Sequence, residues 1–492
     1  MLKSDYWYRF PWLLMAAALV LVGLGIAGIY AATAFERDPV THEIPGDPWP
    51  FWETPAARQL VFVAAAMVVF VVALIPSYTR LAHFSYALYG VSLAALLLLA
   101  VMRCLDLEIR PIIYPTNNAY SWIRIPGLGF KIQPSEVAKI GFIMSLAFYL
   151  RYRKNYRTFR GLLVPFAMAL APTALVLYQP DLGTAMLFLP ILFLMLFAAG
   201  ARAKHLAAII AMGLVMVPIF YSSMRGYQRL RIDSWLLHGC AERVHFALAR
   251  AESEEDEADS VALEAGGPRL SSDEKTRLAD EVTSMWRFRL WRLASWISWG
   301  KDKPEFAATR RRLFEALERS DGPQRFGALR RFFGWLLNEA GHQLFQSKIA
   351  VGSGGFGGRG WLEGTQTRYR LLPEAHTDFL FSTIAEQFGY VGAAAVVILY
   401  MLVCLLGLDV GFSTTEPYGK LFVVGVVALI AAQSFLNLAV SLGLMPITGI
   451  PLPLMSYGGS SLVSSFLALG LLCNVAIRRL YLIAPRPFEW KE

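Results

Sequence analysis

The chain has 492 residues, of which 56% are hydrophobic and 17% are charged, and its mean hydropathy is +0.45. Soluble domains carry about 45–50% apolar and about 25% charged residues, so these numbers exclude an ordinary soluble protein, a disordered chain, a collagen and a coiled coil. The formal net charge is +9. Because Lys and Arg accumulate in the cytoplasmic loops of membrane proteins, this charge favours a membrane protein over a nucleic-acid binder.

Long apolar stretches dominate the chain and predict an all-α, polytopic membrane protein. A helix that crosses about 30 Å of hydrocarbon needs about 20 mostly apolar residues. The first stretch is longer than the about 7–15 apolar residues of a signal peptide, so we interpret it as a span that is retained. The ten predicted spans are residues 11–32, 58–77, 82–103, 134–150, 161–178, 183–200, 205–223, 379–407, 418–441 and 458–477.

Basic residues set the orientation of these spans. With the N-terminus inside, the inner loops carry the Lys and Arg residues that the positive-inside rule places in the cytoplasm. They are Arg80, Arg151, Arg153, Lys154, Arg157, Arg160, Arg202, Lys204, Lys420, Arg478 and Arg479. An even number of spans then returns the C-terminus to the cytoplasm. We therefore expect seven spans in residues 1–224, an extracytoplasmic loop at 225–377, and three spans with a short tail in 378–492.

The long loop has an unusual composition. An acidic run at residues 252–259 is typical of a solvated, disordered stretch, and Ser271 with Glu274 is a capping-box pattern that indicates a helix start. Residues 286–299 mix Trp, Arg and apolar residues. They form either a helix on the outer membrane surface or a small helical insert that packs on itself. The four cysteines show neither metal-ligand spacing nor a disulfide framework.

Polar residues at the predicted outer ends of spans are candidates for function, because charge inside a membrane is costly unless it is paired or faces water. In the QPSEVAK stretch at residues 133–139, Pro and Ser suit a helix start, and Glu136 and Lys139 share one face. This pair keeps a water-filled cavity in shape, contacts a polar substrate, or is a simple buried ion pair. In residues 179–184, Asp181 either caps the next helix or helps to bind a cation or a sugar.

A glycine-rich stretch occupies residues 351–361. Its literal match to a dinucleotide fingerprint is rejected, because that fingerprint needs a βαβ unit and this stretch is an outer loop of a membrane protein. The backbone around Gly354 and Gly355 can still present N–H groups to an anion. The pyrophosphate of a lipid carrier is a suitable anion, with Arg359 close by. The alternative is a flexible loop that needs positive φ.

The LPEAHTDF stretch at residues 372–379 leads into the eighth span. Asp378 is expected at the membrane edge, where burial raises the pKa of a carboxyl toward the value that suits a general base. Glu386, eight residues further on, falls roughly on the same helical face. His376 is either a second acid–base group or an ordinary polar contact. The alternative for Asp378 is that it caps the helix.

Prolines and glycines interrupt the last apolar region at residues 446–461, which include Ser456. Irregular backbone at membrane depth is tolerated only where protein or a cavity covers it. Such a break often marks a substrate site. We therefore expect Ser456 and its neighbours beside the cavity that receives the substrate.

Five ordered motifs on ten spans resemble the SEDS family of membrane glycosyltransferases. The motifs are residues 133–139, 179–184, 346–361, 372–379 and 446–461, and the resemblance covers nearly all of the chain outside the long loop. The Gly-Thr-Gln stretch that ends at Gln366, together with residues 445–454, looks more like the elongation branch, RodA, than the division branch, FtsW.

This resemblance implies a peptidoglycan polymerase that serves cell elongation and cell shape. Members of the family join lipid II, the undecaprenyl-pyrophosphate-linked disaccharide pentapeptide, into glycan strands on the outer face of the bacterial cytoplasmic membrane. They work with a class B penicillin-binding protein, the transpeptidase that cross-links the strands. Other membrane proteins of the elongation complex and membrane lipids are further expected partners, and nucleic acid is not.

The resemblance also assigns roles to particular residues. It implies that Asp378 is essential and is the catalytic residue, here a candidate general base, and that Glu136 and Lys139 are functionally important. Arg359, Lys139 or a divalent cation (Mg²⁺ or Mn²⁺) would stabilise the leaving pyrophosphate. A cation is implicated for the family, but no convincing ligand set is visible in this sequence.

The chain departs from the family pattern in two places. The family usually has a basic residue before the Trp of the loop ahead of the first motif, whereas here Ser121 precedes Trp122, with Arg124 nearby. The family also runs fairly directly from residues 226–232 to the stretch that begins at Gln346, whereas this chain has an insert at roughly 234–340. We interpret that insert as lineage-specific.

Two other functions remain as alternatives. A transporter that flips lipid II would also use broken helices and charges near the midplane, but its site should be reachable from both sides of the membrane. A noncatalytic scaffold for the transpeptidase would tolerate the loss of Asp378. The expected outer positions of Asp378 and the glycine-rich loop favour the enzyme.

Overall fold

The structure is a computed structural model of the chain. It describes residues 9–35, 48–115, 120–125, 130–153, 155–224, 228–229, 231–241, 244, 272–285, 315, 329–330, 332–333 and 341–479. The predicted acidic run at 252–259 and the Trp- and Arg-rich residues 286–299 lie outside the described residues, as does Ser271. Helix α11 (Ser272–Ser284) begins directly after Ser271, where the capping-box pattern predicts a helix start.

All ten predicted spans coincide with helices, which confirms the all-α prediction. These helices are α2 (Trp12–Thr33), α3 (Pro55–Leu74), α5 (Ser85–Cys104), α6 (Pro134–Leu150), α7 (Leu163–Tyr178), α8 (Leu182–Ala199), α9 (Ala203–Ser223), α17 (Leu380–Phe412), α18 (Pro417–Ser441) and α19 (Gly459–Arg478). Among the described residues, eight helices are long and apolar enough to cross a membrane. The other two are α6, with 17 residues, and α9, whose apolar part is Ala203–Val217. The count of ten spans therefore stays a prediction.

Short elements connect these helices. They are η1 (Phe51–Glu53), α4 (Tyr78–His83), η2 (Asn155–Arg157), η3 (Arg160–Leu162), α15 (His342–Ser353) and α16 (Thr365–Arg368). Strands β1 (Ile123–Ile125) and β2 (Phe130–Ile132) form an antiparallel pair in which Ile123 is paired with Ile132.

The chain divides into two compact units. Met1–Ala208, Ile349–Ser441 and Thr448–Glu492 form the first unit, and Ile209–Lys348 with Leu442–Ile447 form the second. All the candidate site residues of the sequence analysis belong to the first unit. These units do not test the limits of the extracytoplasmic loop at residues 225–377, which stay a prediction.

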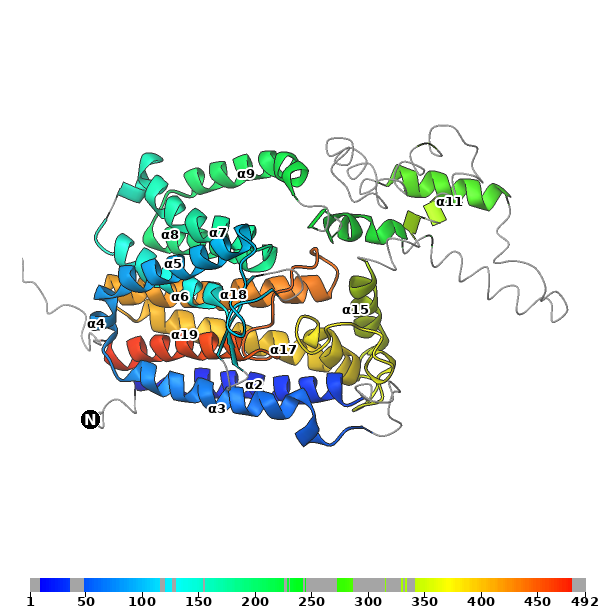
Figure 1. Ribbon diagram of the computed structural model, residues 1–492, viewed down its shortest axis with the longest axis horizontal. Helices are drawn as coiled ribbons and strands as arrows, with labels where there is room; N and C mark the ends of the chain where they lie inside the picture. The colour runs from blue at the N-terminus through cyan, green and yellow to red at the C-terminus, as the bar shows by residue number, and fades with distance from the viewer. Residues whose placement is uncertain are drawn as a thin grey trace, which may run out of the picture. The chain divides into compact units, whose positions relative to one another are not determined.

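Helices α18 and α19 form the core of the first unit, because most of their side chains are buried. α18 packs against α17, α8 and α6, and α19 packs against α3, an arrangement that can be followed in Figure 1. Gly425 permits the close approach of three helices. A Cβ on Gly425 of α18 would lie 2.4 Å from Cγ2 of Ile143 on α6 and 2.8 Å from Sδ of Met195 on α8. The candidate site is built on these same helices.

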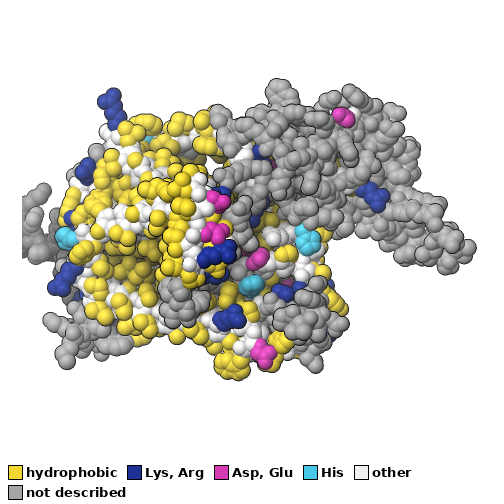
Figure 2. Space-filling model, in the orientation of Figure 1, with side chains coloured by type: hydrophobic (Ala, Val, Ile, Leu, Met, Phe, Trp, Pro, Cys, Tyr) yellow, Lys and Arg dark blue, Asp and Glu magenta, His cyan; other side chains and the backbone are white. Residues whose placement is uncertain are grey.

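Large apolar side chains are exposed on the outward faces of the bundle. Val61, Val68 and Val71 of α3 are each more than half exposed. Figure 2 shows hydrophobic side chains over most of the coloured face, with charged groups at its left edge and right of its centre. Soluble monomers rarely expose contiguous apolar patches larger than a few hundred Å². This surface suits contact with lipid, and the chain is a multi-span membrane protein.

Gly25 of α2 lies against the main chain of Met455. A Cβ on Gly25 would lie 2.5 Å from the carbonyl oxygen of Met455, whereas a Cβ on Gly23 meets nothing within 4 Å. We expect Gly25→Ala to lower the melting temperature of the purified protein in detergent, because overpacking typically costs about 1–3 kcal/mol. Gly23→Ala is the matched control and should not lower it, because alanine is the better helix former. Equal melting temperatures for the two variants would contradict this packing.

Candidate functional site

A buried ion pair joins Glu136 and Lys139 in the first turns of α6. Pro134 is the first residue of this helix, as the sequence predicts, and places Glu136 in its first turn. Nζ of Lys139 lies 2.8 Å from Oε1 of Glu136, and their side chains are only 2% and 5% exposed. Oε2 of Glu136 accepts a hydrogen bond of 2.6 Å from Oγ of Ser464 on α19. The two residues therefore form a buried ion pair. That the pair keeps a cavity in shape or contacts a polar substrate stays a prediction.

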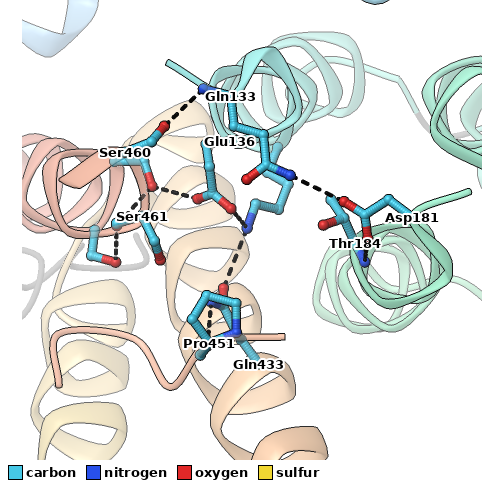
Figure 3. A network of polar contacts seen from close by, with 11 residues as sticks. Gln133, Glu136, Asp181, Thr184, Gln433, Pro451, Ser460 and Ser461 are labelled. Atoms are coloured by element: carbon cyan, nitrogen blue, oxygen red, sulfur yellow. Dashed lines mark hydrogen bonds and ion pairs between the residues drawn. The ribbon is translucent and has the colours of Figure 1, made fainter. Parts of the chain in front are cut away.

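The second predicted cluster lies beside the first, as Figure 3 shows. The side-chain amide of Gln133 donates to Oδ2 of Asp181 at 3.1 Å, and its main-chain N–H donates to Oγ of Ser460 at 3.0 Å. Oδ1 of Asp181 accepts from the main-chain N–H of Thr184 at 2.9 Å, so Asp181 is the N-cap of α8. The capping interpretation is confirmed. Burial raises the pKa of the Asp181 carboxyl, and its hydrogen bonds with Thr184 offset this only in part.

Asp378 lies two residues before α17 and is not its N-cap residue. The N-cap of α17 is Phe379, so the capping alternative for Asp378 is wrong. The main-chain N–H of Asp378 donates to the carbonyl of Glu374 at 3.1 Å. Its carbonyl accepts a hydrogen bond of 2.8 Å from Nδ2 of Asn437 on α18. The half-buried Asp378 is therefore fixed through its main chain.

The predicted break before α19 lies against the same segment. The main-chain N–H of Tyr457 donates to the carbonyl of His376 at 3.0 Å, and the rings of these two residues are 5.5 Å apart. Oγ of the buried Ser456 accepts from the N–H of Leu452 at 2.9 Å. Nε2 of Gln59 on α3 donates to the carbonyl of Ser456 at 3.1 Å. These contacts cover part of the irregular backbone with protein and bring the break and the His376–Asp378 segment together. That Ser456 lines a substrate cavity stays a prediction.

Glu386 of α17 holds the start of α16. Its side chain is fully buried, and Oε1 accepts from the main-chain N–H of Gln366 at 2.8 Å. Oε2 accepts from the N–H and the hydroxyl of Thr367 at 3.1 and 2.7 Å. A Cβ on Gly364 would lie 2.4 Å from Cδ of Glu386, so a side chain there would have to displace the Glu386 carboxylate. Gln366 and Glu386 are thus brought together, in a contact that the helical-face argument for Glu386 did not predict.

The glycine-rich loop packs its backbone against α17. Gly354 passes the helix so closely that a Cβ on it would lie 2.0 Å from the carbonyl oxygen of Ala385. The N–H of Arg359 donates to the carbonyl of Glu386 at 2.9 Å, and that of Gly360 donates to Gln387 at 3.2 Å. The helix can offer these carbonyls because it is interrupted at Gly389, where φ is 64°.

The main chain of this loop therefore has two features. The N–H groups of Gly358, Arg359 and Gly360 are bonded within the protein, and positive φ occurs at Gly355, Gly358 and Gly360. This matches the alternative in which the glycines serve the conformation of the loop. The side chain of Arg359 is exposed, and its contact with an anion stays a prediction.

Trp122 and Arg124 belong to a different local structure. Arg124 is in β1, and its guanidinium lies 3.4 Å from the centre of the Tyr114 ring while Nη1 donates to the Tyr114 carbonyl at 3.0 Å. Trp122, which precedes β1, is half-buried. The contacts described for these two residues do not join them to the other candidate residues.

The predicted divalent cation finds no fitting ligand set in the described part of the chain. No group of three or more His, Cys, Asp or Glu residues lies close enough there to hold a metal ion. Asp181 is bonded to Gln133 and Thr184, and Glu136 to Lys139 and Ser464.

Two residues of the site were missed by the sequence analysis. Gln433 and Asn437 of α18 are buried, and they contact Lys139 and the Asp378 main chain, respectively. The available signal was the presence of two amide side chains four residues apart in an apolar span, since polar groups inside a membrane are rare and tend to be functional.

Comparisons with known proteins identify the relatives of the chain. A family model described as "Cell cycle protein", for FtsW, RodA and SpoVE, matches residues 11–239 and 311–480. The residues between these two matched stretches, 240–310, lie within the predicted insert at roughly 234–340, and the family model matches the rest of that insert. Peptidoglycan glycosyltransferase RodA of Treponema pallidum is 33% identical over 377 residues, which are 74% of this chain and 78% of the relative. Probable peptidoglycan glycosyltransferase FtsW of Bacillus subtilis is 28% identical over 488 residues, 97% of this chain and 92% of the relative.

A similar fold is present among solved structures. A chain in a structure described as "Structural coordination of polymerization and crosslinking by a peptidoglycan synthase complex" has a TM-score of 0.59 to this chain, with 23% sequence identity. The match covers 95% of this chain and 97% of the other. At this identity the likeness shows that the fold is shared.

Breaking the buried ion pair should destabilise the protein. Lys139→Met leaves the Glu136 carboxylate buried without its counter-charge, which typically costs about 3–5 kcal/mol, so we expect a clearly lower melting temperature in detergent. Adding Glu136→Gln to Lys139→Met should restore much of the lost melting temperature, because the neutral amide can still accept a hydrogen bond from Ser464. The control is Lys204→Met, the same change at an exposed lysine. If the double variant lost as much in melting temperature as Lys139→Met and Glu136→Gln lose separately when added together, the two residues would not be coupled.

Proposed function

The chain belongs to the SEDS (FtsW/RodA/SpoVE) family, and from that membership we propose that it is a peptidoglycan glycosyltransferase that polymerises lipid II. The relatives named above as peptidoglycan glycosyltransferases support this proposal over most of the length of both chains. The structural observation that carries it is Asp378, which is half-buried, lies two residues before α17, and is held by Asn437 of α18. The irregular segment contacts its neighbour His376.

The residues of this segment suit a single displacement at a sugar. The hydroxyl of the acceptor sugar attacks the anomeric carbon of the donor, and the Asp378 carboxylate takes the hydroxyl proton as general base. The new bond from oxygen to the anomeric carbon forms as the bond to the undecaprenyl pyrophosphate breaks. One displacement of this kind converts an α-linked donor into a β-linked product. The carboxylic acid of Asp378 then returns its proton to solvent.

The leaving pyrophosphate carries the charge that must be stabilised in the transition state. Of the two cationic side chains considered for this role, Lys139 is buried and paired with Glu136, whereas Arg359 is exposed in the glycine-rich loop. We therefore assign the contact with the pyrophosphate to Arg359. Lys139 supports the site from inside the bundle.

The proposal extends to location and partners. The positive-inside pattern supports placing both termini in the cytoplasm of a bacterium and the site on the outer side of its cytoplasmic membrane. The fold shared with a chain of a peptidoglycan synthase complex supports a class B penicillin-binding protein as the partner. The resemblance of the stretch at Gln366 and of residues 445–454 to RodA supports a role in elongation over one in division.

Asp378→Asn should abolish polymerisation while leaving the fold intact. The amide has nearly the shape of the carboxylate but is not a base, and loss of a general base typically costs about 10²–10⁴-fold in rate. The measurement is the amount and length of the glycan chains made from purified lipid II in detergent. The transpeptidase partner is present, with the transpeptidase active site blocked by a β-lactam. The matched control is Asp409→Asn, at an exposed acidic residue in the last turn of α17.

Three outcomes are distinguishable. Long chains from the wild type and from Asp409→Asn, with none from a folded Asp378→Asn variant, support the proposal. Equal amounts of polymer from all three proteins contradict the role of Asp378. If the wild type makes no polymer, the polymerase function itself fails, and a lipid II flipping assay in vesicles then tests the transporter.

A further inference from the structure

Two buried amide side chains lie one turn apart on α18. Gln433 and Asn437 are 3% and 2% exposed, and their spacing of four residues places them on one face of the helix. A buried amide is stabilised only when its polar atoms find partners. We call these two residues the amide pair.

Gln433 connects the buried ion pair to the irregular segment before α19. Its Oε1 accepts a hydrogen bond of 3.4 Å from Nζ of Lys139, and its Nε2 donates to the carbonyl of Pro451 at 2.9 Å. The two ends of one side chain therefore contact α6 and the segment that contains Pro451. Figure 3 shows Gln433 next to Pro451, across from Glu136.

Asn437 connects the same irregular segment to Asp378. Its Nδ2 donates to the carbonyl of Ile450 and to the carbonyl of Asp378, each at 2.8 Å. An amide nitrogen has two hydrogens, so both are used. Asp378 and Ile450 are far apart in the sequence, and this one group joins their main chains.

We propose that the amide pair positions Asp378 for the reaction, an inference that rests on the proposed function. Neither amide needs to contact the substrate. Asn437 fixes the peptide group between Asp378 and Phe379. Gln433 fixes the segment that contains Pro451 against the ion pair. The orientation of a general base depends on its main chain, and a displacement of about 1 Å can cost about 100-fold in rate.

The competing explanation is that the amides only satisfy buried carbonyls. In that case their loss would lower stability without a specific effect on Asp378. The two explanations differ in what happens to the turn at residues 374–379, where the N–H groups of Thr377, Asp378 and Phe379 all donate to the carbonyl of Glu374. If Asn437 holds this turn, its removal will loosen these three bonds.

The test compares Asn437→Leu, which keeps the approximate size of the side chain but has no donor, with Asn437→Ala, which cannot overpack. The matched control is Ser434→Ala on the same helix, because Ser434 is equally buried and its hydroxyl has no hydrogen-bond partner in the described part of the chain. Two measurements on the full chain are made. They are kcat and KM for lipid II with the blocked transpeptidase present, and hydrogen–deuterium exchange of residues 374–380.

We expect kcat to fall about 100-fold in both Asn437 variants with little change in KM, and the amides of residues 377–379 to exchange faster. Ser434→Ala should match the wild type in both measurements. Wild-type kcat or wild-type exchange at these amides, in either folded Asn437 variant, would overturn the proposal. Because exchange does not depend on activity, it shows whether Asn437 holds the turn even if the wild type makes no polymer, a result that overturns the proposed function separately.

Discussion

The rest of the site depends on the buried ion pair between Glu136 and Lys139. Removing two charges from water costs several kcal/mol for each ion, and their attraction repays this only when the remaining polar atoms also find partners. Ser464 of α19 supplies one partner and Gln433 of α18 supplies another. The ion pair on α6 therefore favours one arrangement of three helices, the one in which both partners reach it.

This arrangement also supports the irregular backbone. The carbonyls of Ile450 and Pro451 lie outside helices, and backbone groups at membrane depth must find their partners within the protein. The two amides of α18 are those partners, and one of them extends the same set of contacts to Asp378. The general base proposed here is thus held by polar contacts inside the bundle as well as by the loop that carries it. The proposed chemistry at the N-terminal end of α17 consequently depends on packing within the core.

The sequence predicts those features that depend on local chemistry. Apolar stretches of about 20 residues predict helices well, and the span at 134–150 agrees with α6 at both ends. The cap at Asp181 follows from the residue that precedes an apolar run. The roles of Gln433 and Asn437 could not be predicted in this way, because their partners are distant in the sequence. Asp378 was identified by its motif, whereas its support from α18 required the fold.

The most direct test of this account breaks the ion pair and follows the main chain around Asp378. Hydrogen–deuterium exchange of the full chain in detergent would be compared between the wild type and Lys139→Met, at a temperature where both are folded. The account predicts faster exchange at residues 377–379, although the contacts that the structure gives Lys139 are with Glu136 and Gln433. Unchanged exchange there would contradict the claim that the buried pair supports the candidate catalytic segment.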